Sequence, residues 1–430
     1  MGENRTMYIS DLSEDPTKFV VDNEESLKVE LNNWNKKTLK LLLSNHDEPV
    51  SGKKESLVEN ILSAIKNHTI SLATLQEWSY RYLEEGKRHL FLFDIVPQIS
   101  NDMKTMSNFE QVLIKGGIER INLLYQDVQD GLVLFDYDVH NDEVSKVRLA
   151  YKEKKMLRFP NYDTDRIERT EIDYYIFCYI DFVDNTLIIN VEPISGLIES
   201  GENDAYVSVK KIALRYKGEM ESVFGLVLQD THDITQRALY RIWKDATRHE
   251  LPEIAEVIDN ITADVESFVE SIASEEKLNL NEESQTKLVH KIITNIEHTI
   301  INENYEEFKE KIEMARNTKP GFITEQNIRE RSGSTLKQKS RNSSTPIEES
   351  DAFGDTIVTI DQLERVQKLT YNWNGLEDIP PGKIHTIIES FLMYDQIIFT
   401  SHTTLEEFNH VLYQLKRYKS KIRAARGSGQ

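Results

Sequence analysis

A short basic turn, Ser51-Gly52-Lys53-Lys54, has residue types that suit contact with phosphate. Lysine ammonium groups attract phosphate oxygens, and backbone amides at the start of a helix donate hydrogen bonds to anions. Ser51 is expected to cap the helix that follows, so that both lysines fall in its first turn. Cations are unfavourable beside that end of the helix dipole unless an anion binds there. The turn therefore predicts a phosphate contact.

Two short helices are expected to position this turn. Pro49 ends the first, because proline lacks an N–H donor and restricts the residue before it. Apolar residues recur at helical spacing on both sides of the turn, namely Leu39, Leu42, Leu43, Leu57, Val58 and Ile61. The expected layout is a helix, an extended turn and a second helix.

This layout resembles the SAP domain, a short helical module that binds DNA. Leu39-Lys40 matches its leading pair, Ser51-Gly52 its turn, Lys54 its following basic residue and Leu57-Val58 its apolar pair. Asp47-Glu48 and Asn60 replace a Gly-Leu pair and an arginine, which makes the segment less positive. The resemblance covers residues 27–66 and implies duplex DNA as the partner. The contacts implied are Lys40, Ser51, Gly52, Lys53 and Lys54. The alternative is an ordinary helical hairpin with a solvated lysine turn.

A second basic cluster near the end of the sequence could add phosphate contacts. It contains Lys416, Arg417, Lys419, Lys421 and Arg423, with no acidic residue among them. The whole chain has 52 basic and 73 acidic residues and a net charge of −21, which repels nucleic acid at low salt. Any DNA contact is therefore expected at such local patches.

One constellation could support metal-dependent cleavage of a phosphodiester. Asp136 and Asp138 fall in a predicted strand, and Glu153-x-Lys155 follows the next one. Nucleases of the restriction-endonuclease type hold magnesium with such carboxylates and place the lysine beside the attacking water. Acidic residues and lysines are abundant in this chain, so we expect a solvated charged turn here instead.

Other catalytic and metal-binding patterns are absent from the sequence. It has no phosphate-binding loop, no Gly-x-Gly-x-x-Gly fingerprint and no Gly-x-Ser-x-Gly elbow. A single cysteine, Cys178, excludes zinc sites built on cysteines. It lies in an apolar strand-like run and is expected to be a buried thiol. His290 and His298 are eight residues apart on a predicted helix, whereas two histidines that coordinate one zinc from a helix are four apart. We expect no catalytic residue, no metal and no cofactor.

The sequence predicts a multidomain α+β protein. Residues 1–26 read as an extended acidic lead-in and residues 27–66 as the SAP-like unit. Residues 71–200 read as a β-rich domain with helices at 71–86 and 105–115, a strand at 89–95 and an antiparallel meander. The meander strands are expected at 118–126, 131–139, 144–151, 170–183 and 186–193, with turns at Asp130-Gly131 and Asp184-Asn185.

The second half of the chain is expected to be helical, then flexible, then α/β. Residues 201–316 carry amphipathic helices at 234–247, 252–273 and 286–300, and serine-rich residues 317–354 read as a flexible linker. Residues 355–415 read as a small α/β module with strands at 356–360 and 396–400, helices at 361–373 and 383–393, a Pro380-Pro381-Gly382 turn and a last helix from Thr403. Residues 416–430 read as a basic tail.

These features predict a non-catalytic, DNA-associated adaptor or recruitment protein. Residues 252–300 or the C-terminal module would bind a protein partner or a second copy, and no membrane partner is expected because no apolar run is long enough. The expected location is cytoplasmic or nucleoid-associated, or nuclear in a eukaryote. The alternatives are a DNA-free protein-assembly factor and a DNA-targeting, metal-dependent nuclease of a bacterial genome-defence system.

Overall fold

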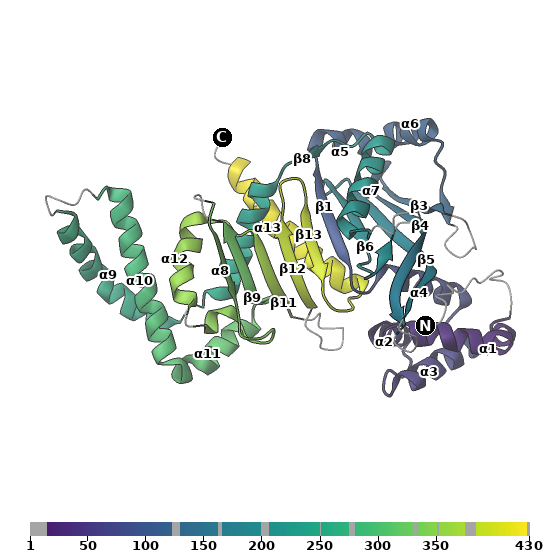
Figure 1. Cartoon of the computed structure of the whole chain (residues 1–430), viewed down its shortest axis with the longest axis horizontal. Coiled ribbons are helices and arrows are strands. Elements are labelled where there is room, and N and C mark those ends of the chain that lie inside the picture. The colour runs from purple at the N-terminus through teal and green to yellow at the C-terminus, as the bar shows by residue number, and fades with distance from the viewer. Residues whose placement is uncertain are drawn as a thin grey trace. The chain divides into compact units, whose positions relative to one another are not determined.

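The chain folds as two compact units. The structure is a computed structural model that describes residues 15–122, 130–161, 166–198, 206–249, 251–274, 280–329, 333–350, 352–374 and 384–427. Unit 1 comprises Met1–Asp230, Leu376–Pro381 and Gln396–His410, and unit 2 comprises Thr231–Gly375, Gly382–Asp395 and Val411–Gln430. Helices and antiparallel strands are both abundant in the described residues, so the predicted multidomain α+β class is confirmed (Figure 1).

Unit 1 begins with a group of four helices around one apolar core. They are α1 (Pro16–Asn33), α2 (Lys36–Ser44), α3 (Lys54–Lys66) and α4 (Leu72–Glu84) (Figure 1). Leu27, Trp34, Leu42 and Ile61 are fully or almost fully buried in that core. Ser71 caps α4, as its position predicts, and accepts a hydrogen bond from the N–H of Thr74.

The acidic lead-in predicted for residues 1–26 is wrong from Pro16 onward, while residues 1–14 lie outside the described part of the chain. The Asp15 carboxylate accepts hydrogen bonds from the N–H groups of Thr17 and Lys18 and caps α1. Phe19, Val20, Leu27 and Leu31 are then buried along one face of this helix. The acidic residues lie on its other faces, so the charge of the segment concealed its helical periodicity.

The predicted antiparallel meander is confirmed in unit 1. Its strands are β1 (His89–Ile95), β2 (Ile121–Asn122), β3 (Gly131–His140), β4 (Glu143–Asn161), β5 (Arg166–Asp181) and β6 (Thr186–Val191). The order is β13-β1-β6-β5-β4-β3-β2, where β13 is Asp395–Phe399. In the register, Leu149 lies opposite Cys178, and Cys178 lies opposite Ile189. Residues 123–126 of the predicted first strand lie outside the described residues.

A turn at Asp184-Asn185 connects β5 to β6, as predicted. Asn185 has a φ of 52°, a left-handed conformation that asparagine tolerates better than most residues. The Asp181 carboxylate accepts hydrogen bonds from the N–H groups of Val183 and Asp184, at 3.1 and 2.9 Å. The side chain thus satisfies backbone donors that the ladder leaves open.

Helices α5 (Pro97–Lys104), α6 (Met106–Gly116) and α7 (Val209–Phe224) and the two-residue strands β7 (Leu197–Ile198) and β8 (Leu228–Gln229) complete unit 1. Phe109 of α6 stacks on Phe224 of α7 and meets Phe182 edge to face. Tyr80 of α4 meets Phe177 of β5 in the same geometry. The aromatic residues around β5 therefore serve packing, as their alternation predicts.

Unit 2 begins with the three helices that the sequence predicts, α8 (His232–Thr247), α9 (Pro252–Ala273) and α10 (Glu282–Glu303). A fourth helix, α11 (Tyr305–Asn317), was not predicted separately. Helix α8 buries Leu239, Ile242 and Trp243. Helices α9 and α10 pack against each other (Figure 1). In the described part of these two helices, only Ile254, Val265, Val269 and Thr294 are buried.

The flexible linker predicted for residues 317–354 is wrong. The segment contains β9 (Gly321–Arg329), β10 (Thr335–Lys339) and a short 3-10 helix, η1 (Ile347–Glu349). Gln326 is fully buried, accepts a hydrogen bond from Trp243 Nε1 at 2.6 Å and donates one to Gln338 Oε1 at 2.8 Å. The polar composition of this segment suggested that it is exposed to solvent. Its polar side chains can be buried because they form hydrogen bonds inside the fold.

The separate α/β module predicted for residues 355–415 is also wrong, because this stretch is divided between the two units. The expected strand 356–360 lies in α12 (Phe353–Leu363), and the expected helices lie largely in β11 (Lys368–Trp373) and β12 (Ile384–Ser390). Phe353, Ile357 and Ile360 are spaced for one buried helical face, which overrides their strand propensity. Unit 2 orders its strands β10-β9-β11-β12, all antiparallel.

The C-terminal strand and helix of the predicted module are present. The strand expected at 396–400 is β13, and the last helix is α13 (Leu405–Gly427). Because α13 continues to Gly427, residues 416–427 form a helix and the predicted basic tail is wrong there. The Pro380-Pro381-Gly382 turn lies outside the described residues.

Candidate functional site

The basic turn connects α2 to α3 in unit 1. The Asn35 side chain caps α2 by accepting a hydrogen bond from the N–H of Lys37 at 2.9 Å. Gly52 has a φ of 121°, and a Cβ there would come within 3.1 Å of Ser56, so the turn requires glycine. Helix α3 starts at Lys54 with Lys53 as its N-cap and no side-chain cap. The expectation that Ser51 caps this helix is therefore wrong.

Three lysines around the turn have no carboxylate partner among the described residues. Lys36 and Lys53 are exposed and Lys40 is half-buried. Lys36 and Lys40 are four residues apart and lie on the same side of α2. Lys37, in contrast, pairs with the buried Glu407 at 3.0 Å. The sequence predicted contacts at Lys40 and Lys53 but not at Lys36. Lys36 becomes a candidate in the structure because, unlike Lys37, it has no carboxylate partner among the described residues.

Lys54 has a different environment from Lys53. Its ammonium group donates a hydrogen bond to the backbone carbonyl of Asn32, at the end of α1. Partial burial lowers the pKa of Lys54, and the nearby Glu55 opposes that effect. This lysine, predicted to contact DNA, therefore ties α1 to α3 in the structure.

The second predicted basic cluster lies on α13. Lys419 is almost fully buried and pairs with Asp395 at 3.0 Å. The Lys421 ammonium and the Arg417 guanidinium lie 5.4 and 5.6 Å from the ring centre of Tyr418. Arg417 and Lys421 remain exposed, whereas Lys416 and Arg423 are half-buried. The five residues therefore do not form one exposed basic surface.

The nuclease constellation is not brought together. Asp136 on β3 lies opposite Arg148 on β4 and not opposite Glu153, which is further along β4. The Asp136 side chain is exposed and lies 3.5 Å from Arg120. The structure describes no group of three His, Cys, Asp or Glu side chains that could hold a metal.

Glu153 instead lines a cavity of about 600 Å³ together with Tyr216, Arg215 and Lys155. Burial raises the pKa of Glu153, but hydrogen bonds from these three side chains outweigh it and leave that pKa below the usual value. Glu153 is thus a carboxylate held by three donors within unit 1.

A cavity of about 310 Å³ in unit 1 was not foreseen from the sequence. Arg88 and His402 line it. Arg88 is 3% exposed, and its Nη1 atom makes no hydrogen bond to the described residues. Burial, then the charges of Lys37 and Arg88, lower the pKa of His402 to about 4. His402 is therefore neutral at pH 7. Arg88 and His402 are far apart in the sequence, so no local motif could have predicted this cavity.

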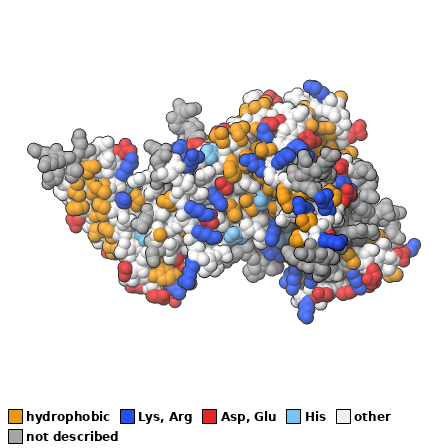
Figure 2. Space-filling view, in the orientation of Figure 1, with side chains coloured by type: hydrophobic (Ala, Val, Ile, Leu, Met, Phe, Trp, Pro, Cys, Tyr) orange, Lys and Arg blue, Asp and Glu red, His pale blue; other side chains and the backbone are white. Residues whose placement is uncertain are grey.

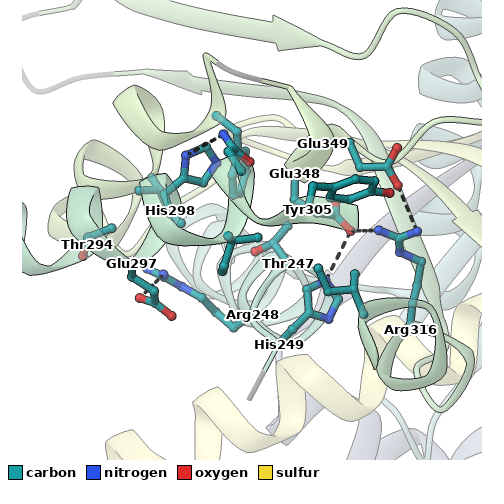
Figure 3. Close-up of a pocket in the computed structure, with 15 residues that line it drawn as sticks. Thr247, Arg248, His249, Thr294, Glu297, His298, Tyr305, Arg316, Glu348 and Glu349 are labelled. Atoms are coloured by element: carbon teal, nitrogen blue, oxygen red, sulfur yellow. Dashed lines mark hydrogen bonds and ion pairs between the residues drawn. The ribbon is translucent and has the colours of Figure 1, made fainter. Parts of the chain in front are cut away.

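A second unforeseen cavity, of about 270 Å³, lies within unit 2 (Figure 3). Arg316 pairs there with Glu348 and Glu349 at 3.3 and 3.1 Å. His249 Nε2 lies 3.5 Å from Glu348 Oε1. His249 follows α8, Arg316 lies on α11 and Glu348 lies on η1, so these residues come from separate parts of the chain. Only the fold brings these charges together, so no spacing in the sequence could have indicated them.

The single cysteine is buried as predicted. Cys178 is 0% exposed in β5, and burial, then the Glu219 charge, raise the pKa of its thiol. A buried thiol of raised pKa is a poor nucleophile.

No protein-family model matches the chain, and no curated protein matches its sequence. In the part of the chain that the structure describes, no helix has both the length and the apolar character needed to cross a membrane.

Proposed function

We propose that the protein is a non-catalytic, DNA-associated adaptor. In this proposal the turn of unit 1 contacts duplex phosphates through Lys36, Lys40, Lys53 and the backbone amides of Ser51 and Gly52. The observation that carries it is the absence of carboxylate partners for these three lysines in the described structure, although carboxylates are abundant. Their positive charge is therefore open to an external anion.

The surroundings of these lysines support a surface contact with phosphate. Lys28 and Lys66, on the same group of helices, both pair with Glu24, and Lys37 pairs with Glu407. Lys36, Lys40 and Lys53, which have no such partner in the described structure, lie along α2 and the turn. Lysine contacts to phosphate position a protein on DNA and carry little sequence information. The proposed mode is therefore tethering without strong sequence preference.

The adaptor proposal also needs a surface for a second macromolecule. Val257 and Phe268 of α9 are 42% and 57% exposed. Figure 2 shows hydrophobic side chains gathered over α9 and α10. Apolar residues exposed along a helix pair favour packing against another helix. We expect α9 and α10 to associate with a second copy of the chain. The double variant Val257→Lys/Phe268→Lys should abolish this association, as measured by sedimentation velocity, without weakening DNA binding.

DNA binding is tested by fluorescence anisotropy with a labelled duplex of about 20 base pairs, over a salt series from about 50 to 200 mM. The variant is Lys36→Gln/Lys40→Gln/Lys53→Gln. Removing one lysine that neutralises a phosphate should reduce the slope of log K against log salt by about 0.9. For the triple variant we therefore expect a reduction of about 3 in the slope and at least a tenfold weaker affinity at low salt.

A matched control removes the same charge elsewhere. Lys28→Gln/Lys66→Gln/Lys309→Gln should leave the salt slope unchanged, because two of these lysines are paired with Glu24 and the third lies on α11. Equal slopes for the two triple variants would contradict the proposal. Absence of binding by the wild-type protein at low salt would favour the DNA-free assembly factor.

A further inference from the structure

The cavity of unit 2 has an apolar wall and a charged wall. Phe353, Ile357 and Ile312 line it and are only 2%, 3% and 3% exposed. The volume of about 270 Å³ is at the small end for ligand sites in proteins. The apolar wall therefore suits one aromatic ring or one branched aliphatic group.

Both arginines at the charged wall are already paired. Arg316 reaches Glu349 through Nη1 and Glu348 through Nη2 (Figure 3). Arg248 pairs with Asp361 and lies 3.7 Å from Glu297. Both guanidinium groups are therefore already neutralised by carboxylates, although Arg316 Nε is buried without a hydrogen-bond partner in the described structure.

The neighbours of His249 determine which of its ring nitrogens accepts a hydrogen bond. Its Nδ1 atom lies 3.2 Å from the Lys319 ammonium, which has only hydrogens to donate, so Nδ1 is the acceptor. The ring proton is then on Nε2, which lies 3.5 Å from Glu348 Oε1. This oxygen of Glu348 thus faces both the His249 ring and the Arg316 guanidinium.

The other oxygen of the same carboxylate is open. Glu348 has a side chain only 8% exposed, and its Oε2 atom is buried without a hydrogen-bond partner in the described structure. A buried carboxylate oxygen without a donor is costly, so a donor that entered the cavity would be stabilised there. Ammonium groups supply such donors together with a compensating charge.

The balance of charge also favours a cation. Glu297, Glu348 and Glu349 line the cavity, and Asp361 shares Arg248 with Glu297. These four carboxylates outnumber the three cations beside the cavity, Arg248, Arg316 and Lys319. An entering anion would meet this excess of negative charge, whereas an entering cation would reduce it.

We propose that this cavity binds a small organic cation with one ammonium group on an apolar body. The ammonium group donates to Glu348 Oε2, and the apolar body packs against Phe353, Ile357 and Ile312. This inference is independent of DNA binding, because it concerns unit 2 alone.

The test uses the full-length protein and three probes of one shape, phenethylammonium, 2-phenylethanol and phenylacetate. Isothermal titration calorimetry and ligand-observed NMR should detect phenethylammonium binding, at least tenfold weaker binding of the alcohol and no binding of phenylacetate. Glu348→Gln should weaken phenethylammonium binding at least tenfold. Glu266→Gln, an exposed position on α9, should leave it unchanged within about twofold.

Two results would overturn the proposal. One is tighter binding of phenylacetate than of phenethylammonium, and the other is equal phenethylammonium binding by the wild type and Glu348→Gln. If Glu348→Gln does not fold, Ile301→Phe narrows the cavity without changing a charge, and it should abolish phenethylammonium binding. Unchanged binding in folded Ile301→Phe protein would equally exclude this cavity.

Discussion

The basic residues around the α2–α3 turn and those on α13 look alike in the sequence but differ in the structure. Lys53, at the turn, is exposed and has no carboxylate partner in the described structure. Lys419, on α13, is 6% exposed and pairs with Asp395, which is 3% exposed. What packs around a lysine therefore decides whether its charge is available to a ligand or serves the fold.

The consequences of removing these two kinds of lysine are different. An exposed, unpaired lysine contributes little to folding, and its removal should mainly change the response of ligand binding to salt. A buried, paired lysine compensates a carboxylate that cannot reach water, and its removal leaves that carboxylate uncompensated. The same substitution can thus test binding at one place and stability at another.

The largest effect is expected at Lys419. Lys419→Met should lower the free energy of unfolding by about 3–5 kcal/mol, because Asp395 would remain buried with only the hydroxyls of Thr235 and Ser390 as donors. Lys421→Met, two positions further on the exposed side, should change it by less than about 0.5 kcal/mol. Urea denaturation measures both, and equal reductions would remove the distinction between paired and exposed cations on α13.

An intermediate effect is expected where internal cations act on a histidine. The pKa of His402 is lowered from 6.5 to about 4 by burial, then by Lys37 and Arg88. Between these pH values the unfolded chain binds more protons, so stability should fall as the pH drops from about 6.5 to 4. Allowing for partial solvent screening, the reduction attributable to His402 is about 1–2 kcal/mol.

The comparison for His402 is between two pH profiles. His402→Gln should show a shallower fall in stability between pH 6.5 and pH 4 than the wild type, measured by denaturation at each pH. Identical slopes would mean that the ring is not held neutral by burial and by the two cations.

The smallest effect separates two adjacent lysines of the turn. Lys54→Met removes the hydrogen bond to the Asn32 carbonyl and should cost about 0.5–1.5 kcal/mol of stability. Lys53→Met should leave stability unchanged and weaken DNA binding. Chemical denaturation measures the stability of the two variants, and the DNA titration measures their affinity. A stability loss in Lys53→Met without one in Lys54→Met would contradict the roles assigned to these lysines.

The sequence predicted the fold best where periodicity was local. The strands at β1 and β3 to β6 were foreseen because turn residues separate runs rich in β-branched and aromatic side chains. Residues 317–390 were not, because their order depends on distant partners such as Trp243 for Gln326. In β12 every second residue is buried, namely Ile384, Thr386, Ile388 and Ser390, but two of these four are polar, so the apolar residues of the sequence do not show a period of two.

The candidate sites show the same limit. Lys53 could be singled out because its turn has a local pattern. Arg88 and His402, or His249 and Glu348, come together only through the fold, and no spacing along the chain records their proximity. Lys54 and Lys419 were predicted to contact DNA but form hydrogen bonds within the protein. Their acceptors, the Asn32 carbonyl and Asp395, lie 22 and 24 positions away in the sequence.

The path of the chain through unit 1 has a consequence for synthesis. Residues 396–410 belong to this unit although residues 231–375 of unit 2 precede them. Glu407 is the partner of Lys37 on α2, and Thr403 forms a backbone bridge with Gly86. A ribosome must therefore translate the intervening residues of unit 2 before the N-terminal unit can close. A nascent chain that stalls before Gln396 would leave Lys37 and Gly86 without these partners.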